Sequence, residues 1–260
     1  EFLERLYNTI GMQTQELSGA DINECRTDPG HFMTDEYNLT QDEWDVVKSW
    51  YDGAISYLDY RIGCFVDALR KRGELENTYL IITADHGEMF GEHGLTQHKY
   101  SLYDTLLHVP LIIRPPDPLD GRVLSDRVSL VDLFSTIIDM ADTHIPDRTH
   151  SRSLLPLRDE QFDGYTFAEI GKQDTEALQR RHPNWAPPKH QIGPLQSIRD
   201  DEFKLIESPD GHIELYRWRE DPGEETELSD EFPDVSQNLL KQLRSETSDM
   251  RTESEHEDIE

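Results

Sequence analysis

An aspartate and a histidine stand side by side in the segment 83–88 (TADHGE), directly after an apolar, β-branched run. In α/β sheets, ligands bind beyond the carboxyl ends of the strands, so side chains at this position can reach a bound group. A carboxylate and an imidazole can both coordinate one divalent ion. Asp85 and His86 are therefore candidate metal ligands. In the alternative interpretation, the Asp85 side chain only caps the element that follows the strand.

Further short motifs follow in a fixed order along the chain. They are Gly91-Glu92-His93-Gly94, His98-Lys99, Tyr103-Asp104 and the segment 108–113 (HVPLII). Together with the segment 83–88, this ordered set resembles the C-terminal block of the sulfatase family, which belongs to the alkaline phosphatase superfamily. The similarity covers roughly residues 40 to 230. Each motif alone is short, and the resemblance depends on their order and spacing.

The resemblance implies a sulfuric ester hydrolase with one divalent ion held beside the ester by Asp85 and His86. Such an ion polarises the ester and lowers the pKa of a nucleophile. Calcium is the ion that the family implies. Manganese and zinc remain alternatives, because imidazole is a better ligand for them than for calcium. The expected substrate is a sulfate ester of a small molecule or a glycan.

The resemblance also implies a cationic side chain that faces the sulfate and its developing charge. Counting forward from Gly94 places His98 in this role, whereas counting backward from Tyr103 places Lys99 there. The segment between Gly94 and Tyr103 is one residue longer than the family pattern, so the two counts differ by one position. We retain His98 and Lys99 as catalytic candidates and favour His98.

Two features of the family are not found in these residues. The N-terminal half of a sulfatase carries an Asp-Asp metal pair and a Cys-x-Pro-x-Arg segment whose cysteine or serine becomes formylglycine. The sequences around Cys25 and Cys64 do not fit that segment. We therefore expect the C-terminal portion of a sulfatase, inactive on its own. A phosphodiesterase or phosphonate monoester hydrolase of the same superfamily is an alternative, as is a non-catalytic remnant that keeps the fold.

The pattern of helices and strands around these residues predicts an α/β fold. A capping box at Thr40–Glu43 begins a long helix that ends at Gly73, and apolar residues at three-to-four spacing predict one buried stripe along it. The apolar segments 78–83 and 109–113 predict strands buried on both faces, and 130–140 predicts a helix. We expect part of a mostly parallel sheet flanked by helices.

A small antiparallel subdomain is expected to follow. The segments 165–170, 195–199, 203–207 and 212–216 predict short strands with turn residues between them, and 234–245 predicts a helix. Acidic composition from 246 to 260 predicts a disordered tail. The expected organisation is a lead-in over 1–39, the α/β part over 40–160, the antiparallel subdomain over 161–245 and the tail over 246–260.

Charge excludes some classes of partner. The chain of 260 residues has 54 Asp and Glu against 25 Lys and Arg, a formal net charge of −29. Such a field repels nucleic acid and anionic membranes, and no apolar run approaches the ~20 residues of a membrane span. Acidity spread along a lysine-poor chain indicates a halophilic source, where salt screens self-repulsion. The sequence leaves the oligomeric state and the location open, with the cytoplasm favoured for the latter.

Overall fold

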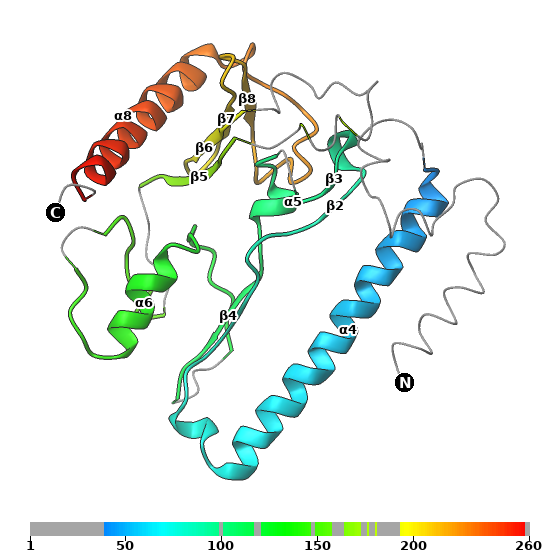
Figure 1. The fold of residues 1–260 in the computed structure, drawn as a ribbon, viewed down its shortest axis with the longest axis vertical. Helices are drawn as coiled ribbons and strands as arrows, with labels where there is room; N and C mark the ends of the chain where they lie inside the picture. Colours follow the sequence, from blue (N-terminus) through cyan, green and yellow to red (C-terminus); the bar gives the residue numbers. More distant parts are fainter. Residues whose placement is uncertain are drawn as a thin grey trace. The chain divides into compact units, whose positions relative to one another are not determined.

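The computed structural model describes residues 39–98, 101–116, 121–146, 149–157, 164–172, 176, 180 and 193–257 (Figure 1). The chain divides into two compact units. The described parts of the first unit are 39–98, 110–116, 176 and 180. The second unit contains 101–109, 121–146, 149–157, 164–172 and 193–257.

The first unit begins with α4 (Gln41–Arg72), whose two ends are capped as the sequence predicts. The Thr40 hydroxyl accepts a hydrogen bond from the Glu43 N–H, and the Thr40 N–H donates to the Glu43 carboxylate at 2.7 Å. This reciprocal pair satisfies amides that the first helical turn leaves without partners. At the other end, Gly73 has φ of 71° and donates its N–H to carbonyls of the last turn. The predicted helix is therefore confirmed at both boundaries.

The predicted burial of the apolar stripe on α4 is wrong for the described structure. Tyr51 is 42% exposed, Ile55 51%, Leu58 58% and Phe65 55%. Glu43 of the capping box is the buried residue of this helix. Spacing alone shows that a helix has an apolar face, but burial also requires an element that covers it.

Both predicted strands of the first unit form, with a different pairing from the one expected. After a 3₁₀ turn at Leu75–Asn77, β1 (Leu80–Thr83) pairs with β4 (Leu111–Arg114) in antiparallel register, with Thr83 opposite Leu111. In this register β4 starts beside the end of β1, whereas a parallel pair needs a crossover connection. The strands are only partly buried, and Ile112 is 57% exposed. The α/β class therefore stands, but a mostly parallel sheet is not confirmed among the described strands.

The second unit contains the predicted antiparallel sheet, with strand order β5-β6-β7-β8. Its strands are β5 (Thr166–Ile170), β6 (Leu195–Arg199), β7 (Lys204–Glu207) and β8 (Ile213–Tyr216). The turns lie at the predicted positions: the Asp200 N–H bonds the Phe203 carbonyl, and Gly211 adopts φ of 85°. All three strand pairs are antiparallel.

One face of this sheet packs against α8 (Pro233–Glu257). The shared core consists of Ile198, Phe203, Leu205, Leu215, Leu239 and Leu243. The helix continues to Glu257, whereas the sequence predicted its end at 245 and disorder beyond. Residues 246–257 contain no Gly or Pro, and extending an existing helix costs far less than nucleating one. None of the helices in the described part of the chain is long and apolar enough to cross a membrane.

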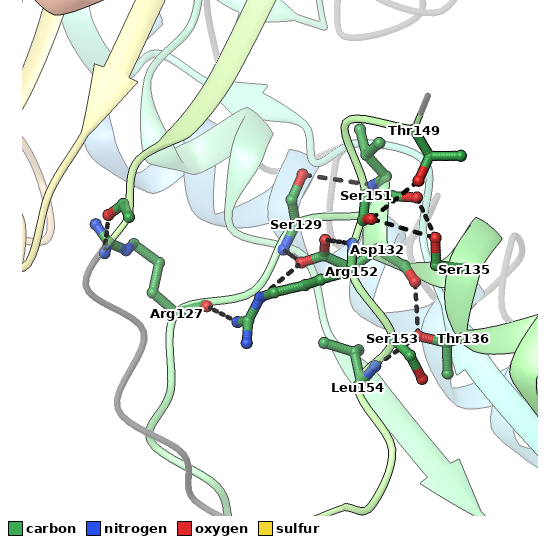
Figure 2. A network of polar contacts seen from close by, with 12 residues as sticks. Arg127, Ser129, Asp132, Ser135, Thr136, Thr149, Ser151, Arg152, Ser153 and Leu154 are labelled. Atoms are coloured by element: carbon green, nitrogen blue, oxygen red, sulfur yellow. Dashed lines mark hydrogen bonds and ion pairs between the residues drawn. The ribbon is translucent and has the colours of Figure 1, made fainter. Parts of the chain in front are cut away.

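The predicted helix over 130–140 is α6 (Asp132–Met140), and a polar network fixes its start (Figure 2). Asp132 accepts hydrogen bonds from the N–H groups of Ser129 and Arg152, each at 3.0 Å. The Arg152 guanidinium donates to the Arg127 carbonyl at 2.8 Å. The Asp132 carboxylate therefore accepts the Ser129 amide before the helix start and also joins α6 to the segment that contains Arg152.

Candidate metal and ester-binding site

A short hairpin in the first unit holds two of the site residues. Strand β2 (Met89–Phe90) pairs with β3 (Thr96–Gln97), and Met89 lies opposite Gln97. Glu88 and His98 are the next residues outward on the two strands, so the hairpin register brings them together. The His98 Nδ1 lies 2.9 Å from the Glu88 Oε2. This contact joins residues ten positions apart in the sequence.

Contacts with α4 fix the turn of this hairpin. Gly91 has φ of 100°, and a Cβ there would lie 2.9 Å from the Trp44 side chain, so both backbone and packing favour glycine. Lys48 on α4 pairs with Glu92 at 3.2 Å. Burial acts to raise the pKa of Glu92, but the hydrogen bond from the Phe90 N–H and the Lys48 ammonium together hold it below its usual value. The glycine motif is therefore a structural turn that supports the site.

The predicted metal ligands Asp85 and His86 lie in the loop that leaves β1. The Asp85 Oδ1 accepts a hydrogen bond from the His86 N–H at 3.0 Å, and its Oδ2 lies 3.8 Å from the His86 Nε2. The His86 Nδ1 lies 2.8 Å from the Gly87 carbonyl, which can accept its proton and leave Nε2 as the donor to a metal. The pair therefore fits one divalent ion, with the rest of calcium's ~6–8 ligands coming from other groups.

The two loops meet at His86 and His98. Their rings stack with centroids 4.4 Å apart and an interplanar angle of 25°. The structure thus places a predicted metal ligand beside the favoured sulfate-facing residue. Lys99, the other catalytic candidate, lies outside the described residues.

The sequence analysis did not select Glu88 as a site residue. One nitrogen each from His86 and His98 and one oxygen from Glu88 all lie within 4.8 Å of one another. All three side chains are accessible, with exposed fractions of 43% for His86, 24% for Glu88 and 44% for His98. The signal that could have identified Glu88 is its place opposite His98 across the hairpin.

The acidic member of the Tyr103-Asp104 motif has a structural role in the second unit. Asp104 begins the short helix α5 (Asp104–Leu107), and its carboxylate pairs with Lys204 at 2.7 Å and with Arg199. Lys204 also pairs with Glu224 at 2.6 Å, and Glu224 accepts the Asp104 N–H at 2.5 Å. Burial acts to raise the pKa of Asp104, but Lys204 and Arg199 outweigh it and keep this pKa below 3.8. Burial raises the pKa of Glu224 above 4.5.

The aromatic member of the motif enters a second buried cluster of the same unit. The hydroxyls of Tyr103 and Tyr216 donate to one oxygen of Glu214, at 2.9 and 2.8 Å. Burial and the nearby Glu214 carboxylate raise the pKa of both tyrosines, so both remain hydrogen-bond donors. The Tyr103-Asp104 pair therefore connects α5 to the antiparallel sheet.

Comparison with known proteins identifies the family of this chain. The model for the family "Sulfatase" matches residues 22–143, and the model for "N-sulphoglucosamine sulphohydrolase, C-terminal" matches residues 91–253. The chain is 31% identical to arylsulfatase K from Canis lupus familiaris over 214 residues. This match includes 80% of the chain and only 38% of that relative's length.

Solved structures of two enzymes also match this chain in fold. The phosphonate monoester hydrolase of Agrobacterium radiobacter matches with a TM-score of 0.67 and 26% identity, over 82% of this chain and 43% of that one. The phosphonate monoester hydrolase of Silicibacter pomeroyi matches with a TM-score of 0.66 and 26% identity, over 90% of this chain and 49% of that one. The chain belongs to the sulfatase family, and the second family model matches more than half of its residues.

Proposed function

We propose that this chain provides the C-terminal part of the active site of a metal-dependent sulfuric ester hydrolase. Asp85 and His86 bind one divalent ion, with calcium favoured and manganese or zinc as alternatives. His98 and Lys99 face the sulfate group. The substrate is a sulfate ester of a small molecule or a glycan.

The observation that carries this proposal is the stacking of His86 on His98, at 4.4 Å between ring centroids. A metal ligand and a cation for the ester must act on the same few oxygen atoms. The loop after β1 and the end of β3 bring the two side chains to that distance although they lie in different motifs. The exposure of both histidines leaves them accessible to a substrate.

Each residue has a chemical task in this proposal. When bound, the ion polarises the ester and favours ionisation of the nucleophile. Asp85 contributes negative charge to the ion, and Gly87 orients the imidazole of His86 through its carbonyl. Glu88 orients His98 through the 2.9 Å contact and thereby directs its other nitrogen outward. The formylglycine nucleophile that the family uses belongs to the other part of a complete sulfatase site.

A second candidate function is hydrolysis of phosphonate monoesters or phosphodiesters. The two phosphonate monoester hydrolases above match this chain in fold at 26% identity each. Sulfate and phosphonate monoesters present similar tetrahedral oxygens, and an Asp-His metal pair fits either. The residues of this chain do not separate the two substrates.

The test uses a complete parent protein that contains this chain, assayed on an aryl sulfate and an aryl phosphonate monoester with the same leaving group. We expect faster turnover of the sulfate, and a loss of about a hundredfold or more for Asp85→Ala, His86→Ala and His98→Ala. A salt series belongs in the assay, because a charge of −29 indicates self-repulsion that salt screens.

Three outcomes would count against the proposal. Preference for the phosphonate ester would establish the second candidate. A folded parent without activity on either ester would support a non-catalytic remnant. Full activity of folded Asp85→Ala and His86→Ala variants would remove the metal assignment.

A further inference from the structure

We propose that an exposed apolar face of α4 binds the remaining part of a sulfatase, and that the two parts stay associated without a peptide bond between them. This docking face consists of Ile55, Leu58 and Phe65, with the half-buried Ile62 and Leu69 on the same side of the helix. The inference rests on the proposed function, in which the nucleophile belongs to that other part.

The spacing of the docking face defines a continuous surface. Its five residues recur at intervals of three and four, so they lie on one side of the helix. The side chains of Ile55, Leu58 and Phe65 are each more than half exposed. Ile55 and Phe65 lie about 15 Å apart along the helix axis. Contiguous exposed apolar side chains of this kind mark an interaction site.

Both ends of α4 already have contacts in the first unit. Near its start, the Trp44 side chain packs against Gly91, and the Tyr51 ring meets Phe90 edge to face with centroids 5.2 Å apart. Beyond its end, Leu75 of the 3₁₀ turn is buried. These contacts hold the two ends of the helix, whereas the docking face between them is left to another partner.

The strand pair of the same unit also needs a partner. Among the described strands, β1 and β4 pair only with each other, and Ile112 on β4 is mostly exposed. A two-stranded sheet is at best marginally stable without further strands or a covering helix. In α/β domains, strands extend such a sheet and helices cover its faces. An occupant that supplies strands and apolar side chains would therefore satisfy both α4 and the β1–β4 pair.

The relatives of this chain indicate which occupant supplies these groups. The chain covers 38% of the length of the dog arylsulfatase K and 49% of the Silicibacter pomeroyi structure, so more than half of each lies outside the match. The proposed metal site needs that part as well, because Asp85 and His86 supply only two of calcium's ~6–8 ligands. A second copy of this chain would instead bring the same two ligands and another charge of −29.

The test uses a complete parent protein with a specific protease site placed before Glu1. After cleavage, the 260-residue chain is held on a biosensor surface by a C-terminal tag, and release of the upstream part is followed in time. We expect slow release from the wild-type chain. Leu58→Gln and Phe65→Gln should each accelerate release by at least about tenfold, because each removes a large apolar side chain from the interface while glutamine still favours a helix.

Tyr60→Gln is the matched control on the same helix. The Tyr60 side chain is 65% exposed, and its position two residues from Leu58 places it about 200° around the helix, away from the docking face. Release from this variant should stay within about twofold of the wild-type rate. Equal acceleration by Leu58→Gln and Tyr60→Gln would overturn the proposal, as would immediate release from the folded wild-type chain.

Two further measurements separate the possible explanations. Sedimentation velocity of the isolated chain detects self-association: immediate release together with a dimer that Leu58→Gln dissociates would assign the docking face to a second copy. Turnover is measured on the uncleaved parent, and circular dichroism verifies the fold of each variant. Immediate release from an active parent would overturn this proposal alone. Slow release from a parent inactive on both esters would remove the hydrolase proposal alone.

Discussion

The hairpin around Glu88 and His98 and the charge cluster around Lys204 both bring ionisable side chains within hydrogen-bond distance, but they differ in exposure. Glu88 and His98 are 24% and 44% exposed and contact each other at 2.9 Å. Lys204 and Glu224 are each 1% exposed and pair at 2.6 Å. Exposed groups of this kind stay accessible to an ion or ester, whereas buried charges need partners within the fold. The motif residues of this chain therefore divide into an exposed set, which we propose binds ligand (the ligand-binding set), and a buried structural set.

The largest expected loss of stability follows from a substitution in the structural set. Lys204→Met removes the ammonium that two carboxylates share, while the methionine keeps a similar length. Asp104 would then retain its pair with Arg199, whereas Glu224 would lose the ammonium that it contacts. Breaking a buried ion pair in this way costs about 3–5 kcal/mol. Urea unfolding of the chain followed by circular dichroism measures this loss.

Lys48→Met is the matched control in the other unit. Its pair with Glu92 at 3.2 Å is 40% and 34% exposed, so we expect a loss of about 0–1 kcal/mol. Similar losses for Lys204→Met and Lys48→Met would contradict the division between the two regions.

The second prediction concerns the pH dependence of stability in the same cluster. Glu224 has a folded pKa above 4.5, so the folded state holds its proton more tightly than the unfolded chain does. Its contribution to stability is therefore lost as pH rises from 4.5 through the folded pKa. Asp104 has a folded pKa below 3.8, so its contribution is present above 3.8 and is lost as pH falls through the folded value.

Glu224→Gln should gain stability relative to the wild type as pH rises above 4.5, because the glutamine still accepts the Asp104 N–H and carries no charge. Asp104→Asn should gain relative to the wild type as pH falls below 3.8. Urea midpoints of the three proteins across the acidic range measure both differences. If the urea midpoints of the two variants changed in the same direction relative to the wild type as pH rises, the opposite pKa shifts assigned to Glu224 and Asp104 would be wrong.

Local signals in the sequence predicted much of the fold. The capping box at Thr40, the stop at Gly73 and the turns at Asp200 and Gly211 act over a few residues, and the structure confirms them. Pairing of β1 with β4 and exposure of the α4 stripe depend on which distant element lies alongside, which spacing does not encode.

The same reasoning applies to the site. Asp85 and His86 were selected because they follow a strand directly, and the structure stacks His86 on His98. Glu88 escaped selection because its role depends on the register of a two-residue hairpin, which is too short to give a pattern. The role of Tyr103-Asp104 was equally hidden, because the side chains that the pair contacts in the sheet lie 95 or more residues away.

The smallest expected effect on stability belongs to the ligand-binding set, and a comparison of two aspartates isolates it. Asp85 and Asp132 each accept a backbone N–H at 3.0 Å, but their side chains are 89% and 8% exposed. Water can replace Asp85 as the acceptor, so Asp85→Ala should change the free energy of unfolding by no more than about 0.5 kcal/mol. Asp132→Ala leaves the amides of Ser129 and Arg152 without their acceptor in a partly buried position and should cost about 1–3 kcal/mol. Urea unfolding of both variants measures the contrast. A large loss for Asp85→Ala would mean that this carboxylate supports the loop itself, and any loss of activity in that variant would then no longer report on metal binding.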